Sequence, residues 1–171
     1  DFFSGAGGTS QGLAAINKLF PLFKFLGGCD INFSSASSYS HNYATPIFNA
    51  DIRDLAYKPG AMRKALKDMG FDRKKPTFLI GCAPCQGFSS HRKKHWGQEE
   101  DQRNNLIMAF MEVVRYVRPV VVLMENVPEF LSGRYWEHFA AARKSLMKMG
   151  YIVKDNIYNA ATFGVPQERF R

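Results

Sequence analysis

The sequence predicts an α/β fold, with a mostly parallel sheet flanked by helices, in a single domain that covers residues 1–171. Short apolar runs alternate along the chain with longer amphipathic segments, and this alternation is typical of βαβ units. Hydrophobic residues make up 46% of the chain and charged residues 22%, which is the balance of an ordinary globular domain. A chain of 171 residues is also long enough for one sizeable core.

Each expected element follows from its own pattern. Apolar runs predict strands, and apolar residues at helical spacing predict helices. In chain order we expect a strand end at Asp1–Phe3, a strand at Phe23–Asp30, helices at Phe33–Tyr43 and Ala61–Met69, a strand at Thr77–Cys82, a helix at Arg103–Val117, a strand at Val120–Met124, a helix at Tyr135–Met149 and a last strand at Tyr151–Tyr158. The polar segment Ser89–Asn105 is expected to be a lid or binding loop. Because the first strand lacks a start and another strand could follow Arg171, we expect a fold truncated at both ends.

Composition limits the partners and the setting. The formal charge of +8 suits a polyanionic partner, although basic proteins without one are common. No apolar stretch approaches the length of a membrane span, and no secretory leader is visible. The three cysteines, Cys29, Cys82 and Cys85, are an odd number without the density of a disulfide scaffold, so we expect a reducing, cytoplasmic setting.

The segment Pro84-Cys85-Gln86 places a thiol directly after the expected strand that ends at Cys82. In an open α/β sheet, ligands bind beyond the carboxyl ends of the strands. The spacing Cys82-x-x-Cys85 also fits a redox dithiol or half of a metal site. A zinc site needs further ligands at matching spacing, and a redox pair normally opens a helix, whereas glycine and serine follow here. We therefore favour a packed Cys82, a reactive Cys85 and no metal.

The opening segment Asp1–Gly12 is a glycine-rich turn from a strand end into a helix. Glycines permit positive φ and the close approach of a ligand to the backbone. The carboxylates of Asp30 and Asp51 follow two expected strands, at positions from which a carboxylate reaches a ribose or an adenine amino group. Together they favour a nucleoside cofactor. The alternative is a tight turn with two aspartates that cap turns or helices.

Three charged residues complete the candidate chemistry. Glu125 closes the strand Val120–Met124, where partial desolvation favours a carboxyl that donates a proton near neutrality. Arg169 and Arg171 are two residues apart and can hold a polar ring or a phosphate. The alternatives are an exposed glutamate and a pair of solvated arginines.

Taken together, these motifs resemble the DNA (cytosine-5)-methyltransferase family over the whole chain. The segments that carry the resemblance, in the family's order, are Asp1–Gly12, Pro84-Cys85-Gln86, Glu125-Asn126-Val127 and Gly164–Arg171. The resemblance implies a Rossmann-like methyltransferase fold with S-adenosylmethionine as cofactor. It implies that Phe3 stacks on the adenine, that Asp30 holds the ribose hydroxyls and that Asp51 contacts the adenine edge. The implied pocket consists of Phe3, Gly5, Ala6, Gly8, Asp30, Ile31, Asp51, Ile52, Pro84 and Leu106.

The resemblance also implies the reaction. The Cys85 thiolate would attack carbon 6 of a cytosine flipped out of double-stranded DNA, Glu125 would protonate ring nitrogen 3, and Arg169 would hold the ring carbonyl oxygen. Arg171 would support the loop. The implied contacts to nucleic acid are Gln86, Ser89, Arg92, Lys93 and Lys94. For Arg92, Lys93 and Lys94, the alternative is an exposed loop held by salt bridges, because acidic residues follow them in the sequence.

In the family, the sequence continues past the Gln-x-Arg-x-Arg element, here Gln167–Arg171, into a target recognition domain and then returns to complete the cofactor pocket. None of that is present here. We therefore expect a catalytic core that needs a complementing C-terminal fragment. Two alternatives stay open: a non-catalytic remnant that binds the cofactor or DNA with a partner chain, and a cytosine-5 methyltransferase that acts on transfer RNA.

Overall fold

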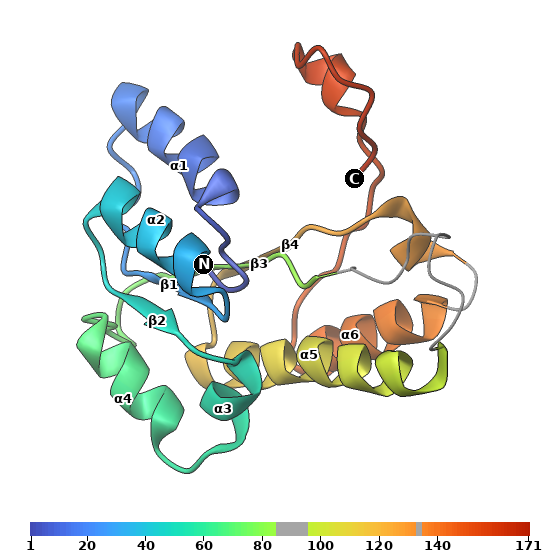
Figure 1. Cartoon of the computed structure of the whole chain (residues 1–171), viewed down its shortest axis with the longest axis horizontal. Coiled ribbons are helices and arrows are strands. Elements are labelled where there is room, and N and C mark those ends of the chain that lie inside the picture. Colours follow the sequence, from blue (N-terminus) through green and yellow to red (C-terminus); the bar gives the residue numbers. More distant parts are fainter. Residues whose placement is uncertain (85–95, 133–134) are drawn as a thin grey trace.

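The computed structural model describes residues 1–84, 96–132 and 135–171, without the side chains of 96–105. Its elements are α1 (Gly8–Leu19), β1 (Gly28–Asp30), α2 (Phe33–Tyr43), β2 (Ile47–Asn49), α3 (Ile52–Tyr57), α4 (Ala61–Asp68), β3 (Phe78–Gly81), α5 (Trp96–Val117), β4 (Val121–Met124), the 3-10 helix η1 (Pro128–Leu131), α6 (Trp136–Lys148) and the 3-10 helix η3 (Ala160–Phe163). The alternation of strands and helices confirms the predicted α/β fold (Figure 1).

The sheet is parallel, and its centre is a single residue near the start of the chain. β1 pairs with β2, and β3 pairs with β4, each in parallel. Phe2 joins the two pairs, because it bridges Cys29 of β1 and Gly81 of β3, again in parallel. The order across the sheet is therefore β2, β1, Phe2, β3, β4. This confirms the strand end expected at Asp1–Phe3. β1 and β2 lie on one side of it and β3 and β4 on the other, as around the switch point of a doubly wound sheet.

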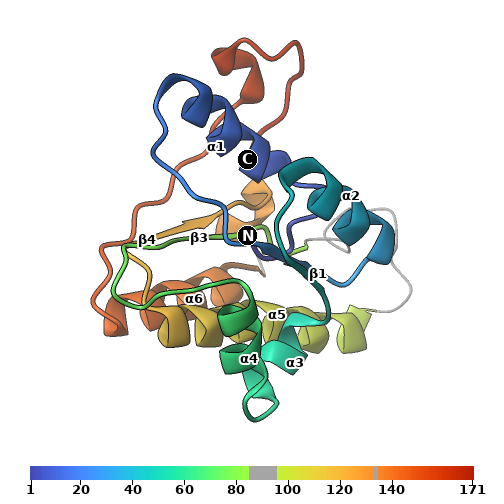
Figure 2. The same cartoon turned by 90° about the vertical axis from the view of Figure 1, so that its left-hand side faces the viewer.

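Helices cover the two faces of the sheet unequally. α1 and α2 lie on one side, while α3, α4, α5 and α6 lie on the other (Figures 1 and 2). The core lies mainly against α5, whose Phe110, Met111 and Val114 are completely buried. Phe110 packs edge-on against Phe2, with ring centroids 6.2 Å apart. The α5 helix is thus packed against the centre of the sheet at Phe2.

Three predicted elements differ from the structure. The strand expected at Phe23–Asp30 begins only at Gly28, because the Asn17 side chain holds the preceding backbone instead. Asn17 donates to the Phe23 carbonyl (2.6 Å) and accepts from the Phe23 N–H (2.8 Å). The helix expected from Arg103 begins at Trp96, so the expected loop Ser89–Asn105 is wrong over its last ten residues. Glutamate and glutamine, which each occur twice there, are good helix formers as well as polar.

The last strand expected, at Tyr151–Tyr158, is wrong: this segment has no strand. Backbone hydrogen bonds hold it at its ends, from the Tyr151 N–H to the Leu146 carbonyl and between Tyr158 and Arg171 in both directions (2.8 and 2.9 Å). Ile152 is 91% exposed. A strand requires a neighbour along its length, and none of the described residues pairs with residues 152–157. The residues after it fold back on themselves and stand apart from the body of the molecule (Figure 1).

Among the described residues, no helix is both long enough and apolar enough to cross a membrane.

Candidate active site at the carboxyl edge of the sheet

The carboxyl ends of the strands bring most of the predicted site residues to one edge. The glycine-rich turn follows Phe2, Asp30 ends β1, Pro84 lies shortly after β3, and Glu125 follows β4 directly. Because neighbouring parallel strands end at the same edge, these residues converge although they are far apart in the sequence. Cys85, Gln86, Ser89, Arg92, Lys93 and Lys94 lie outside the described residues.

The glycine-rich turn has an unusual backbone. Phe3, Gly5 and Gly7 have φ values of +55°, +54° and +98°. For Phe3, a side chain in this left-handed region costs of order 1–3 kcal/mol, and such residues cluster at functional sites. Gly7 caps the N-terminus of α1 without a side-chain hydrogen bond. Ala6 and Gly8 are exposed, as a ligand-binding backbone requires.

Asp30 ties the end of β1 to this turn. Its Oδ2 accepts a hydrogen bond from the Gly5 N–H (2.8 Å), and its Oδ1 accepts one from the Asn32 N–H (2.8 Å). A carboxylate oxygen has a second lone pair, so both oxygens can accept a further hydrogen bond. Ile31 beside it is 68% exposed. The structure thus brings an acceptor and an uncovered apolar side chain to the turn.

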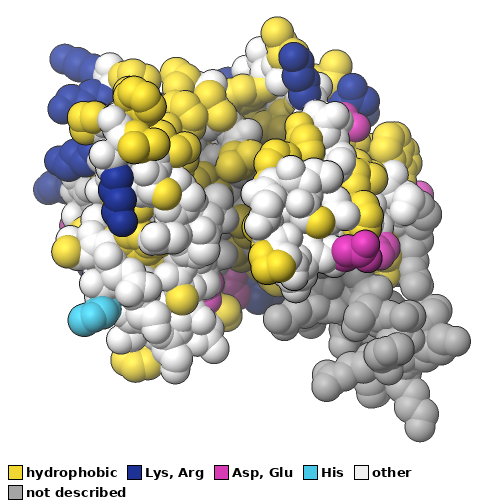
Figure 3. Space-filling view, turned by 90° about the horizontal axis from the view of Figure 1, so that it is seen from above, with side chains coloured by type: hydrophobic (Ala, Val, Ile, Leu, Met, Phe, Trp, Pro, Cys, Tyr) yellow, Lys and Arg dark blue, Asp and Glu magenta, His cyan; other side chains and the backbone are white. Residues whose placement is uncertain are grey.

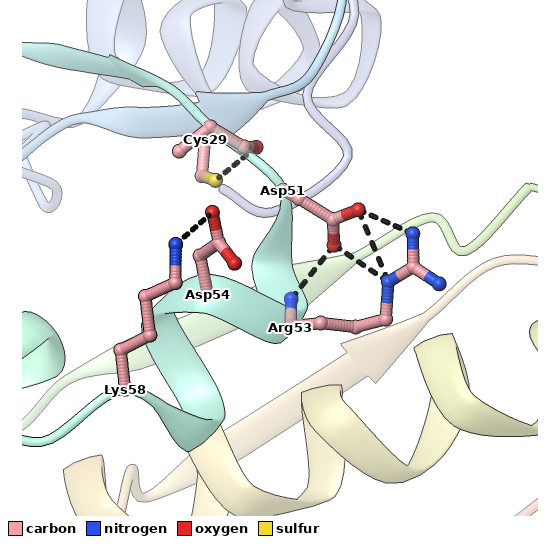
Figure 4. A network of polar contacts seen from close by, with 6 residues as sticks. Cys29, Asp51, Arg53, Asp54 and Lys58 are labelled. Carbon is pink, nitrogen blue, oxygen red and sulfur yellow. Dashed lines mark hydrogen bonds and ion pairs between the residues drawn. The ribbon is translucent and has the colours of Figure 1, made fainter.

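Asp51 is held by a neighbour that the sequence analysis missed. It caps α3 by accepting from the Arg53 N–H (2.8 Å), and the Arg53 Nε lies 3.0 Å from each of its oxygens (Figure 4). These contacts hold the pKa of the Asp51 carboxyl below its ordinary value. Ile52 is 3% exposed, so its side chain packs in the core and only its backbone can meet a ligand. The sequence feature that could have identified Arg53 is its place two residues after an aspartate that caps a helix.

The surroundings of the two described cysteines favour the protonated thiol. Cys29 is 2% exposed, and burial raises the pKa of its thiol to about 12. Burial also raises the pKa of Cys82, whose Sγ lies 3.4 Å from the Thr9 hydroxyl. A thiol that stays protonated is a poor nucleophile. The expected packing of Cys82 therefore agrees with its surroundings.

Glu125 forms an ion pair with Arg171, with 2.7 Å between Oε1 and Nε. The Glu125 side chain is 42% exposed, so it is partly buried at the end of its strand. Arg169 has an exposed side chain and uses its backbone N–H on the Asn159 side chain (3.1 Å). Of the two predicted arginines, the structure therefore places Arg171 beside Glu125. The spacing of residues in the sequence could not show which arginine pairs with Glu125, because the ion pair joins residues 46 positions apart in the chain.

An apolar groove of about 510 Å³ begins at this ion pair. Its walls are β4, the α6 residues Phe139 and Leu146, and the segment from Val153 to Tyr158. Seen from above, hydrophobic side chains line the hollow between the lobe of α1 and α2 and the C-terminal segment (Figure 3). β4 has β3 on one side and no strand among the described residues on the other. The groove therefore runs along a free sheet edge.

The family model for C-5 cytosine-specific DNA methylases matches residues 1–171. The chain belongs to this family. It is 30% identical to the type II methylase M.HgiDII of Herpetosiphon aurantiacus and 31% identical to the type II methyltransferase M1.HphI of Haemophilus parahaemolyticus. Each match covers 100% of this chain but only 44% and 43% of the relative. The chain thus spans less than half the length of these curated relatives.

Solved structures agree with this family and fold. A protein of an E. coli prophage, described as a DNA modification methyltransferase, superimposes with a TM-score of 0.75 at 26% identity over 99% of this chain and 43% of that one. The Dnmt2 methyltransferase of S. pombe superimposes with a TM-score of 0.67 at 23% identity over 99% and 45%, which supports the fold alone. The predicted methyltransferase fold is confirmed.

Proposed function

We propose that this chain is the catalytic half of a DNA (cytosine-5)-methyltransferase, which transfers a methyl group from S-adenosylmethionine to carbon 5 of cytosine in DNA. The observation that carries the proposal is one edge of the sheet. There the Glu125–Arg171 pair, the turn tied to Asp30 and the strand leading toward Cys85 converge. Family membership supports the same reaction class.

The residues at this edge fit S-adenosylmethionine, which would supply a methyl group on a positively charged sulfur. The free lone pairs of Asp30 suit ribose hydroxyls, and the exposed Ile31 suits the face of the base. Phe3, Pro84 and Leu106 would form the walls of the pocket, with the backbone of Gly5, Ala6 and Gly8 at the methionine portion. Asp51 and the Ile52 backbone would meet the adenine edge, where Asp51 would share its oxygens with Arg53.

At the cytosine, we assign the first step to Cys85. Its thiolate adds to carbon 6 while Glu125 gives a proton to ring nitrogen 3, so carbon 5 becomes an enamine-like nucleophile that takes up the methyl group. A base then removes the proton of carbon 5, elimination releases the thiolate, and ring nitrogen 3 returns its proton to Glu125. The target must leave the duplex first, because a stacked base does not expose carbon 6 to a thiol. Gln86, Ser89, Arg92, Lys93 and Lys94 would contact the displaced nucleotide and its phosphates.

The ion pair changes the assignment of the arginines. Arg171 lies against Glu125 and is 29% exposed, so it is the better candidate to hold the ring carbonyl oxygen next to the glutamate. Arg169 has an exposed side chain on the C-terminal segment. We therefore propose that Arg171 serves the ring and that Arg169 has the supporting role, the reverse of the assignment by resemblance.

The partner proposed for the groove beside β4 is a β-strand from a complementing C-terminal fragment. The curated relatives extend well beyond the matched region, so they contain chain that could provide such a strand. Val121 and Leu123 of β4 are 40% and 49% exposed, and the groove walls are mainly apolar. An extended segment with alternating apolar residues would satisfy both the free backbone edge and these side chains.

Covalent trapping tests the proposed function. The chain would be mixed with the C-terminal portion of M.HgiDII, S-adenosylmethionine and DNA that contains 5-fluorocytosine, in which fluorine blocks the elimination. We expect a stable protein–DNA adduct that Cys85→Ser abolishes. Arg171→Ala should lower its yield at least tenfold more than Arg169→Ala, which is the matched control. An adduct on transfer RNA instead of DNA would favour the RNA enzyme, and cofactor binding without any adduct would favour the non-catalytic remnant.

A further inference from the structure

The C-terminal end of α2 holds the glycine-rich turn from behind. The Tyr43 hydroxyl donates a hydrogen bond to the Gly7 carbonyl at 2.6 Å. The neighbouring Asn42 side chain donates to the Ala6 carbonyl at 3.2 Å. Two consecutive carbonyls of the turn are thus bound by two consecutive side chains of one helix, from residues 36 positions away in the chain.

The Tyr43 ring is itself fixed in place. Its centroid lies 4.7 Å from that of Tyr39 and 5.4 Å from that of Phe25. A Cβ atom on Gly7 would lie 2.2 Å from a ring atom of Tyr43, so the glycine backbone lies directly against the ring. Burial raises the pKa of Tyr43, which keeps the hydroxyl protonated as a donor. The contact is therefore a rigid one.

A hydrogen bond on a carbonyl also orients the N–H of the same peptide unit. In a trans peptide the carbonyl and the N–H point in opposite directions. The Gly7 carbonyl accepts from the Tyr43 hydroxyl and also from the Gln11 N–H of α1 (2.8 Å), so the Gly8 N–H of the same peptide points away from both donors. Gly8 is exposed and begins α1, where backbone N–H groups favour negatively charged ligands. The carboxylate of a bound methionine portion has that charge.

We propose that Tyr43 is a positioning residue for the cofactor: its hydroxyl, together with the Gln11 N–H of α1, fixes the Gly7–Gly8 peptide in the orientation that binds the methionine portion. This inference rests on the proposed function, because it assumes that the turn binds S-adenosylmethionine. Asn42 has the same role one peptide earlier, through Ala6. Neither residue touches the cofactor in this proposal, so each acts through the backbone of the turn.

The chain offers a closely matched control. The Tyr151 hydroxyl donates to the Pro119 carbonyl, also at 2.6 Å. Pro119 precedes β4, at the edge of the sheet opposite to the glycine-rich turn. Tyr43→Phe and Tyr151→Phe each remove one hydroxyl and one hydrogen bond to a carbonyl, and both keep the ring. A purely structural role predicts the same behaviour for the two variants.

The test is calorimetric titration of the chain, together with the complementing fragment, using two ligands. S-adenosylhomocysteine contains the methionine-derived portion, whereas 5′-methylthioadenosine lacks its amino and carboxyl groups. We expect Tyr43→Phe to bind S-adenosylhomocysteine about tenfold more weakly, because a hydrogen bond to a charged group is lost or misdirected. Its affinity for methylthioadenosine should stay within twofold of the unmodified chain. Tyr151→Phe should bind both ligands normally, and Asn42→Ser should resemble Tyr43→Phe.

Several outcomes overturn the inference. Unchanged affinity of Tyr43→Phe for S-adenosylhomocysteine would show that the hydroxyl does not position the turn. Equal weakening for both ligands would show a general distortion of the pocket rather than a directed peptide. If the unmodified chain with its complement binds neither ligand, the proposed function fails, and the inference fails with it.

Discussion

The glycine at the end of β3 allows a sharp test of how this core is packed. A Cβ atom at Gly81 would lie 2.4, 2.6 and 2.8 Å from three atoms of the Phe110 ring. Phe110 is completely buried, and its ring is flanked by Phe2 and Phe3, with centroids 6.2 and 6.4 Å away. The ring therefore has little room to move, and Gly81→Ala should overpack the core.

The size of the effect can be separated from backbone strain. Gly81 is not among the residues with positive φ, so alanine can adopt its backbone conformation and the cost is steric. Overpacking of this kind costs about 1–3 kcal/mol of unfolding free energy. Gly12 is the control: it lies inside α1 with nothing within 4 Å of its added Cβ. There the same substitution should stabilise the protein by about 0.5–1 kcal/mol, because alanine favours helix.

Urea unfolding followed by circular dichroism measures both free energies. We expect the two alanine variants to shift the midpoint in opposite directions. Phe110→Leu removes the ring atoms that clash, so the double variant with Gly81→Ala should be more stable than the sum of the single effects by at least about 0.5 kcal/mol. If Gly81→Ala is neutral or stabilising, the packing of Phe110 against β3 described above is incorrect.

Three further predictions concern local contacts. Arg53→Ala should lower the free energy of unfolding above about pH 4. Arg53 holds the pKa of the Asp51 carboxyl below its ordinary value of 3.8, so the ion pair is lost when Asp51 is protonated, and the difference from the unmodified chain should shrink as the pH falls below 3.8. Urea unfolding from pH 2 to 6 tests this, and a pH-independent difference would contradict it. Cys29 should resist iodoacetamide at pH 8 in the native chain and react in urea, as peptide mass mapping would show; rapid native labelling would contradict its burial. Asn17→Ala should cost about 1–3 kcal/mol in urea unfolding, because the backbone at Phe23 loses its side-chain partner; a loss no larger than that of a surface substitution would show that other contacts hold this segment.

The sequence predicted helices better than strand limits. α2 coincides with its prediction, and α6 and α4 agree within one residue, because apolar spacing and capping residues are local signals. Strand limits depend on a neighbour. Residues 23–27 and 151–158 are apolar enough for strands, yet the Asn17 side chain binds the backbone of Phe23, and residues 152–157 find no strand partner among the described residues. Periodicity cannot reveal either condition.

The candidate site was predicted by residue type rather than by arrangement. The turn, Asp30 and Glu125 were identifiable because each lies at a strand end in a parallel sheet. The pairing of Glu125 with Arg171, the hold of Arg53 on Asp51 and the contact of Tyr43 with Gly7 were not. Apart from the near neighbour Arg53, these contacts join residues 36 or more positions apart, so the fold creates them.

The place of Phe2 at the centre of the sheet has a consequence for synthesis on the ribosome. Its bridging partners, Cys29 and Gly81, follow it by 27 and 79 residues. At roughly 5–20 residues per second, the second partner is made about 4–16 s after Phe2 itself. During that interval one side of the central strand has no neighbour, while β1 and β2 can already pair. The nascent chain therefore exposes an apolar strand edge for seconds, and a chaperone that binds extended apolar segments would meet it there first.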